Sequence, residues 1–191
     1  MDQKIQVYEL DIRPTDRYLM ERFIAGSAQI HGGEWTSFSQ SATWHSATGV
    51  QLTPGDYRPD LRYLSVDIET SFPRTDEPDR LFSIAFYGPD FSHVLMIDAD
   101  NGDDSCGTYE AVVDEPTLLT RFLDVIAEYD PDVLIGWNFI QFDMAFLKRK
   151  FAEHDIPFAL GRDGSLLDWR QSALNPDRIF LHTPGRVILD G

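Results

Sequence analysis

The stretch Tyr63-Leu-Ser-Val-Asp67-Ile-Glu69-Thr70 decides how most of this chain is expected to fold. Apolar and polar residues alternate along it, and this period of two predicts a β-strand with its apolar side chains on one face. The carboxylates of Asp67 and Glu69 then share the other face at the end of the strand. Two carboxylates 4 Å apart would repel by about 4 kcal/mol at an effective dielectric constant of about 20, and a divalent cation between them would reverse that sign. A polar strand end that faces solvent is the alternative that this short motif leaves open.

A second acidic motif, Leu134-Ile-Gly-Trp-Asn138-Phe-Ile-Gln-Phe142-Asp143, follows further along the chain. An apolar strand is expected to pass at Asn138 into a helix that ends near His154, with the Asn138 side chain as its N-cap. Asp143 would lie on the sheet-facing side of this helix, where a carboxylate is costly unless it is paired or bound to a metal ion. A hydrogen bond from a backbone amide near the cap is the alternative. If the two strands are neighbours, Asp143 reaches towards the two carboxylates of the first motif.

The order of the predicted elements favours an α/β (α+β) fold with a mixed sheet and flanking helices. Three strands in a meander precede a helix, a strand, a second helix and a last strand, so the sheet is expected to be antiparallel on one side and parallel on the other. A small mixed segment over residues 1–60, ending in a Pro- and Gly-containing linker, is expected to precede the main domain at residues 61–191. Strands are predicted at 5–12, 63–69, 81–87, 92–97, 132–137 and 186–190, helices at 14–24, 114–130 and 138–154, and short strands and turns at 27–52.

Composition limits the classes of protein that fit. A chain of 191 residues with 42% apolar and 13% aromatic residues can bury a sizeable core, which excludes a disordered tail. No apolar run approaches the length of a membrane span, and the first residues lack the apolar run of a secretory signal, so no membrane partner is expected. The lone Cys106 has no partner for an internal disulfide, which favours a reducing, cytoplasmic setting.

The net charge of −16 is unusual for a protein that binds nucleic acid, because such proteins are commonly basic. Eight acidic and six basic residues lie before Tyr63, whereas 24 acidic and 10 basic residues follow from Tyr63 onward. The negative charge therefore accompanies the acidic motifs. Bound metal ions could offset part of it, or the basic surface that holds a nucleic acid lies on sequence outside this chain. A solvated acidic surface accounts for much of the rest.

The two acidic motifs resemble the first two motifs of the proofreading 3′→5′ exonuclease domain of family B DNA polymerases. The likeness runs nearly end to end, from about Ile5 to Gly191, and is far more specific than either short motif. The stretches that carry it include Val7-Tyr-Glu-Leu-Asp-Ile-Arg-Pro, Tyr129-Asp-Pro-Asp-Val-Leu-Ile-Gly-Trp-Asn and Gly185-Arg-Val-Ile-Leu-Asp-Gly.

The resemblance implies a ribonuclease-H-like fold, preceded by part of the polymerase N-terminal domain. It also implies that Asp67, Glu69 and Asp143 ligate two divalent metal ions, Mg²⁺ or Mn²⁺, and are the catalytic residues. Thr70 and Asn138 would help to seat the 3′-terminal nucleotide of single-stranded DNA. Phe142 or Phe139 would pack near that nucleotide, although Phe142 could also belong to the core and the core is the favoured place for Phe139.

This sequence departs from the family pattern after the second motif. The family has a third motif, Tyr-x-x-x-Asp, on a later helix, and the chain ends before such a motif, so we expect a domain truncated before its last helix. We expect an internal fragment of a longer bacterial, nucleoid-associated polymerase, with little or no nuclease activity by itself. Its partners would be DNA, the remaining polymerase domains and a sliding clamp reached through parts absent here. Asp168 and Asp190 are the only nearby candidates for the fourth carboxylate.

Two other functions stay open at this point. The first is a free-standing exonuclease of the same acidic superfamily, which requires a fourth ligand within this chain. The second is a domain that binds nucleic acid or a partner protein and carries out no chemistry. Metal titration separates these two, because only the enzyme requires a paired metal site.

Overall fold

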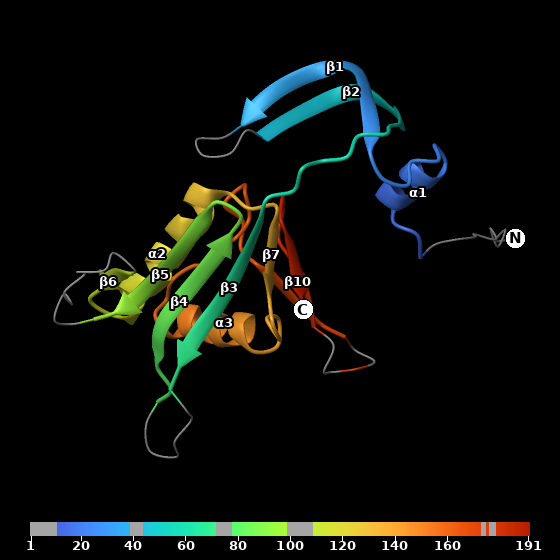
Figure 1. Cartoon of the computed structure of the whole chain (residues 1–191). Helices are drawn as coiled ribbons and strands as arrows, with labels where there is room; N and C mark the ends of the chain where they lie inside the picture. The colour runs from blue at the N-terminus through green and yellow to red at the C-terminus, as the bar shows by residue number, and fades with distance from the viewer. Residues whose placement is uncertain (1–10, 39–43, 72–77, 99–108, 173–174, 176–178) are drawn as a thin grey trace, which may run out of the picture. The chain divides into compact units, whose positions relative to one another are not determined.

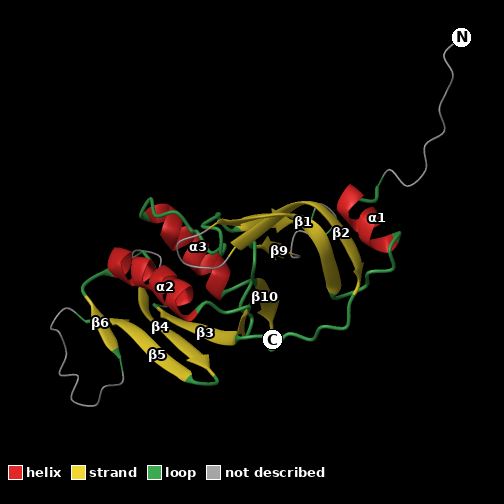
Figure 2. Cartoon of the chain, turned by 90° about the horizontal axis from the view of Figure 1, so that it is seen from above, coloured by secondary structure: helices red, strands yellow, loops and turns green. Residues whose placement is uncertain are grey.

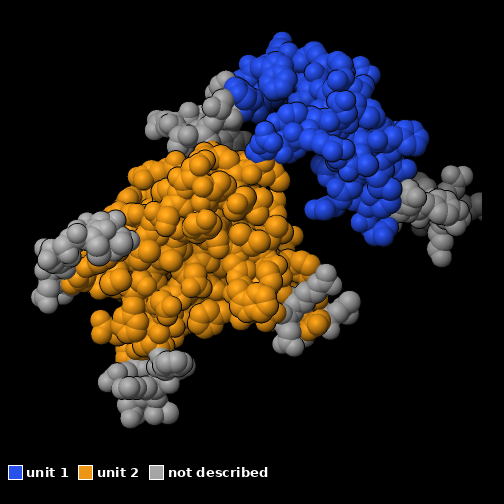
Figure 3. Space-filling view, in the orientation of Figure 1, with its two compact units in different colours: residues 1–60 blue, residues 61–191 orange. Residues whose placement is uncertain are grey.

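The computed structural model describes residues 11–38, 44–71, 78–98, 109–172, 175 and 179–191 (Figure 1). The chain divides into two compact units, Met1–Asp60 (unit 1) and Leu61–Gly191 (unit 2), shown in different colours in Figure 3. Cys106 and most of the strand predicted at 5–12 lie outside the described residues. No helix in the described part of the chain is long and apolar enough to cross a membrane.

Unit 1 holds a short helix and a two-stranded hairpin. Helix α1 (Pro14–Met20) begins with proline at its first position and ends four residues earlier than predicted. Strands β1 (Ala28–Phe38) and β2 (Trp44–Pro54) pair antiparallel from Ala28 opposite Pro54 to Phe38 opposite Trp44. The prediction of short strands and turns at 27–52 is therefore wrong. Glycines that adopt positive φ, including Gly33 at +86°, interrupt the sequence pattern without ending the strands.

Unit 2 is built on a six-stranded sheet of order β10-β7-β3-β4-β5-β6. The first three strands of unit 2 pair antiparallel, as β4 against β3 and β5, whereas β7 and β10 run parallel to β3, which confirms the predicted mixed sheet. The strands are β3 (Tyr63–Thr70), β4 (Leu81–Gly88), β5 (Phe91–Ile97), β6 (Glu110–Val112), β7 (Val133–Gly136) and β10 (Val187–Asp190). The sequence analysis did not predict β6.

Both long helices cover the same face of this sheet, as Figures 1 and 2 show. Helix α2 (Glu115–Tyr129) starts where predicted, because the Asp114 carboxylate accepts a hydrogen bond from the Thr117 amide at 2.9 Å. The core lies between the helices and the sheet, and its fully buried large side chains are Leu64, Leu81, Ile84, Leu95, Leu118, Leu119, Phe122, Ile126, Leu134, Phe139, Met144 and Phe151.

Helix α3 (Asp143–Glu153) begins five residues later than predicted, and Asn138 is not its N-cap. Asn138 has φ +50°, a left-handed conformation that a right-handed helix excludes, so residues 137–142 form a turn and the regular helix starts after it. The N-cap position falls on Phe142, which has no side-chain acceptor.

A second hairpin in unit 2 was not predicted. Strands β8 (Asp168–Gln171) and β9 (Ile179–His182) pair antiparallel, with Asp168 opposite His182. Each of its strands is four residues long.

Candidate active site

Asp67 and Glu69 lie on the sheet face that points away from the core. Leu64, Val66 and Ile68 are buried against the helices, whereas Asp67 and Glu69 are exposed, as the alternation predicts. Among the described residues, no side chain forms a hydrogen bond or an ion pair with either carboxylate. Both groups are therefore available to a ligand.

Asp143 joins the second motif to the first. It is the first residue of α3 and is only 2% exposed, and its Oδ1 accepts a hydrogen bond of 3.1 Å from the backbone amide of Ile68, 75 residues away in sequence. This bond forms where β7 no longer accompanies β3, since the last paired residues of these two strands are Ile135 and Ser65. The Asp143 carboxylate accepts a hydrogen bond from an amide of β3 that β7 leaves unpaired. Asp143 is therefore fixed beside the strand that carries Asp67 and Glu69.

The surroundings of Asp143 favour its protonated form. The pKa of Asp143 is raised to about 6, chiefly by burial and also by the nearby negative charges of Asp67 and Asp190. Its own amide and that of Ile68 act in the opposite direction, because hydrogen bonds to a carboxylate lower its pKa. A buried carboxyl group beside two other carboxylates is an environment that a divalent cation would stabilise.

The carboxylates form an incomplete ligand set as they stand. Their oxygen atoms suit Mg²⁺ or Mn²⁺, because these hard cations prefer oxygen ligands. Within the described ranges, however, no three Asp, Glu, His or Cys side chains lie close enough together to hold a metal ion. The structure brings Asp143 and Asp67 together and does not bring Glu69 into one ligand group with them, so the three-residue metal site stays a prediction.

A cavity of about 290 Å³ opens between the end of β3 and the first turns of α3. Two of the predicted substrate-binding residues, Thr70 and Phe142, line it, and Phe142 is 47% exposed. The third, Asn138, is exposed and is not among the residues that line the cavity. Phe139 is fully buried and belongs to the core, as the sequence analysis favoured. The other described residues of the cavity wall are Ser71, Asp79, Gln141, Ala145, Phe146 and Arg149.

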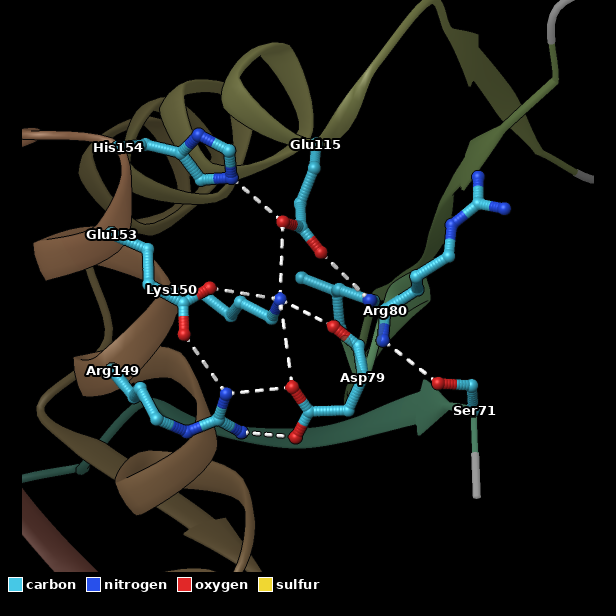
Figure 4. A network of polar contacts seen from close by, with 9 residues as sticks. Ser71, Asp79, Arg80, Glu115, Arg149, Lys150, Glu153 and His154 are labelled. Carbon is cyan, nitrogen blue, oxygen red and sulfur yellow. Dashed lines mark hydrogen bonds and ion pairs between the residues drawn. The ribbon is translucent and has the colours of Figure 1, made fainter. Parts of the chain in front are cut away.

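A buried lysine fixes one wall of this cavity (Figure 4). Lys150 is 3% exposed, and its Nζ donates to the carbonyl oxygen of Asp79 and lies 3.0 Å from Glu153 and 3.4 Å from Glu115. Both terminal nitrogens of Arg149 donate hydrogen bonds to the Asp79 carboxylate, and this pair closes the cavity on that side.

Two of these carboxylates, those of Asp79 and Glu115, have pKa values below their usual range. Hydrogen bonds and the positive charge of Arg149 hold the pKa of Asp79 below its usual range. Burial acts to raise the pKa of Glu115, but His154, the Leu81 amide and Lys150 lower it overall. The Leu81 amide donates to Glu115 at 2.8 Å, so the start of β4 is tied to the first turn of α2.

Sequence reasoning missed this network, because three basic residues in a row near the end of a predicted helix, Lys148-Arg-Lys150, favour a solvated surface, whereas Lys150 is buried. The available signal was spacing. Lys150 lies three residues after Leu147 and four after Phe146, on the buried side of the helix.

Asp190, one of the two candidates for a fourth carboxylate, makes a contact that the sequence did not predict. It ends β10, and its Oδ1 accepts a hydrogen bond of 2.6 Å from the Phe139 amide. Asp168, the other candidate for a fourth carboxylate, starts β8 and pairs with the exposed Arg170.

Residues 5–190 match the family model described as DNA polymerase family B, exonuclease domain. This chain belongs to that family. It is 38% identical over 192 residues to DNA polymerase II of Escherichia coli, which covers 98% of this chain and 23% of that protein. It is 31% identical over 190 residues to a DNA polymerase of Desulfurococcus, which covers 97% of this chain and 20% of that protein.

The fold of this family B exonuclease domain also occurs among solved structures. A family B DNA polymerase from Pyrobaculum calidifontis matches with a TM-score of 0.67 and 23% identity, over 97% of this chain and 23% of that one. This match supports the ribonuclease-H-like fold that the sequence predicted. The chain spans less than a quarter of the length of these relatives.

Proposed function

We propose that this chain supplies most of the proofreading 3′→5′ exonuclease domain of a DNA polymerase II-like enzyme. The observation that carries the proposal is the contact between Asp143 and Ile68, which joins the two acidic motifs at one place. In this reading Asp67, Glu69 and Asp143 hold two divalent ions, Mg²⁺ or Mn²⁺, which supply an activated water and stabilise the leaving 3′ oxygen.

The residues of the chain perform separate tasks in this proposal. Burial and the hydrogen bond from the Ile68 amide fix the Asp143 side chain, so its second oxygen can bind a metal ion without further loss of side-chain conformational entropy. Asp67 and Glu69 stand on a strand of a six-stranded sheet and have no competing partners among the described residues. A metal ion binds the deprotonated carboxylate, so loading the site removes the proton that burial favours on Asp143.

The cavity beside Thr70 and Phe142 suits the terminal nucleotide of a single-stranded 3′ end. Aromatic side chains stack on bases irrespective of sequence, which a proofreading site requires, and Phe142 offers an exposed ring at the cavity wall. Asn138 is proposed as a further contact to this nucleotide, since its left-handed turn precedes the exposed Phe142.

The partners follow from the polymerase relatives. We propose that DNA and the remaining domains of a longer polymerase complete the site, that a sliding clamp binds elsewhere in that polymerase, and that it acts in DNA replication or repair in the bacterial cytoplasm, at the nucleoid. The similarity to DNA polymerase II of Escherichia coli supports this placement. The charge of −16 also supports it, because a chain so acidic requires basic surface from other domains to hold DNA.

Calorimetric titration with Mn²⁺ tests the proposal. We expect the wild-type chain to bind Mn²⁺, and we expect Asp67→Ala and Asp143→Ala to bind it at least tenfold more weakly, while the control Asp168→Ala binds as the wild type does. Absence of binding at millimolar Mn²⁺ in the wild type would refute the proposal and favour a non-catalytic binding domain.

We expect the isolated chain to show little or no excision of a single-stranded oligonucleotide. No tyrosine follows Tyr129, so the third family motif with its tyrosine and fourth acid is missing. Robust Mg²⁺-dependent 3′ excision that Asp67→Ala abolishes would show that this expectation is wrong.

A further inference from the structure

Asp190 and the turn that leads to Asp143 meet at the end of the parallel strands. Strand β10 pairs with β7 so that Asp190 stands opposite Gly136, the last residue of β7. The Gly191 amide then donates to the Gly136 carbonyl at 2.9 Å, and the Asp190 carboxylate accepts from the Phe139 amide at 2.6 Å. Strands β10 and β7 thus end side by side, and the Asp190 side chain contacts the turn that follows β7.

This turn has little support of its own. Asn138 adopts a left-handed conformation with φ +50°, and Phe142 cannot cap α3 through its side chain. Two backbone hydrogen bonds stabilise the turn. The Phe142 amide donates to the Asn138 carbonyl at 3.0 Å, and the Met144 amide donates to the Phe139 carbonyl at 2.8 Å. The Phe139 amide at its start is bonded to Asp190, and such a bond to a carboxylate is stronger than one between neutral groups.

Strand β10 is itself anchored at its other end. Arg186, directly before the strand, has a side chain that is 5% exposed and bonds to the Asp130 carboxylate at 2.7 Å and to the Leu160 and Pro131 carbonyl oxygens. The Val187 amide donates to the Asp132 carbonyl at 2.8 Å. Asp190 therefore stands on a strand that is held from both sides.

Fixing Phe139 also fixes Asp143. The Phe139 ring is fully buried, and Asp143 follows four residues later as the first residue of α3. The Met144 amide bonds to the Phe139 carbonyl, so a shift of Phe139 would move the first turn of the helix and the carboxylate on it.

We propose that Asp190 is a positioning residue that braces the Phe139 amide and thereby holds the Asp143 carboxylate beside Asp67. This inference rests on the proposed function, because Asp143 is useful there only as a ligand or catalytic group. It differs from the role of a fourth metal ligand, since Asp190 would act through the Phe139 amide and not on a metal ion.

Three variants distinguish the effect of the hydrogen bond between Asp190 and Phe139 from the effect of the Asp190 negative charge. Asp190→Asn keeps an oxygen that can accept from Phe139 but removes the negative charge, whereas Asp190→Ala removes both. Asp168→Ala is the matched control, because Asp168 also lies on a strand and pairs with the exposed Arg170. For each chain, amide hydrogen exchange by NMR reports the protection of Phe139 and Met144, and Mn²⁺ affinity reports the state of the site.

We expect Asp190→Ala to raise the exchange rates of the Phe139 and Met144 amides about ten- to a hundredfold, the factor expected for loss of one hydrogen bond to a charged group. We expect its Mn²⁺ affinity to fall at least tenfold below that of Asp190→Asn, which should retain near-native exchange rates. Unchanged exchange at Phe139 in Asp190→Ala would overturn the proposal, as would equal Mn²⁺ affinities for the two Asp190 variants. A wild-type chain that binds no Mn²⁺ would instead refute the proposed function, and the exchange rates would still decide whether the brace exists.

Discussion

Replacing Lys150 by methionine removes the cation at the centre of the network in Figure 4 while keeping a side chain of similar length. The amine is 3% exposed and contacts the Asp79 carbonyl and the carboxylates of Glu115 and Glu153. Among the described residues, its loss leaves Glu115, whose side chain is 16% exposed, with the Leu81 amide and His154 as partners.

The expected cost follows from the burial of the partners. Breaking a buried ion pair by removing one member costs about 3–5 kcal/mol, because the remaining charge is left without compensation. Glu153 is 44% exposed and can turn to solvent, and Glu115 keeps two partners, so we expect the lower end of that range. At about 3 °C per kcal/mol for a unit of this size, Lys150→Met should lower the melting temperature of unit 2 by about 10 °C.

The assay is urea unfolding of unit 2, followed by tryptophan fluorescence and by far-ultraviolet circular dichroism. The matched control is Lys148→Met, two residues earlier on α3, where the amine is exposed and lies 4.4 Å from the centre of the Trp169 ring. That contact is worth about 0.5–1 kcal/mol, so the control should lose no more than this. A loss below about 1 kcal/mol for Lys150→Met, or equal losses for both variants, would refute the assignment of Lys150 as the centre of the network.

Three further predictions concern the site itself. Because the pKa of Asp143 is raised to about 6 from 3.8, the folded chain binds this proton more tightly, and the stability it confers is fully present below pH 3.8 and lost as the pH rises through 6. Between pH 4.5 and 7 in EDTA, the unfolding free energy of the wild type, measured in urea, should therefore fall by about 2 kcal/mol more than that of Asp143→Asn, and equal slopes would contradict this. Gly136→Ala should destabilise unit 2 by about 1–3 kcal/mol in the same assay, since the added carbon would stand 2.7 Å from the Val66 carbonyl oxygen, and an unchanged midpoint would show that β7 can move away from β3. Phe142→Ala should weaken binding of a short single-stranded oligonucleotide by about 1–3 kcal/mol in fluorescence anisotropy with an unchanged melting temperature, and undiminished binding would exclude the ring as a stacking surface.

Sequence reasoning predicted the sheet better than it predicted the turns. The alternation in β3 and the apolar spacing of α2 are local patterns that the fold preserves, and so the mixed sheet, the buried face of β3 and the start of α2 were all predictable. The turn at 137–142 was not, because an asparagine suits both an N-cap and a left-handed position, and only the tertiary structure selects one.

The missed contributors to the site are contacts between distant segments. Lys150 bonds to Asp79, 71 residues away, and Asp190 bonds to Phe139, 51 residues away. The local sequence identifies neither partner, because the spacing of Lys150 indicates only its burial, and charged residues at a helix end or a strand end usually face solvent. Asp67, Glu69 and Asp143 were recognisable as candidates because Asp67 and Glu69 end one apolar strand and Asp143 follows another, but the sequence could not show that Asp143 also completes the hydrogen bonding of β3.

Paramagnetic broadening of amide signals by substoichiometric Mn²⁺ tests the central claim most directly, because it maps where the cation binds along the chain. We expect selective loss of the signals of Val66 to Glu69, of Asp143 and of Asp190. Broadening confined to other acidic segments, with these signals intact, would show that the two motifs do not form one cation site.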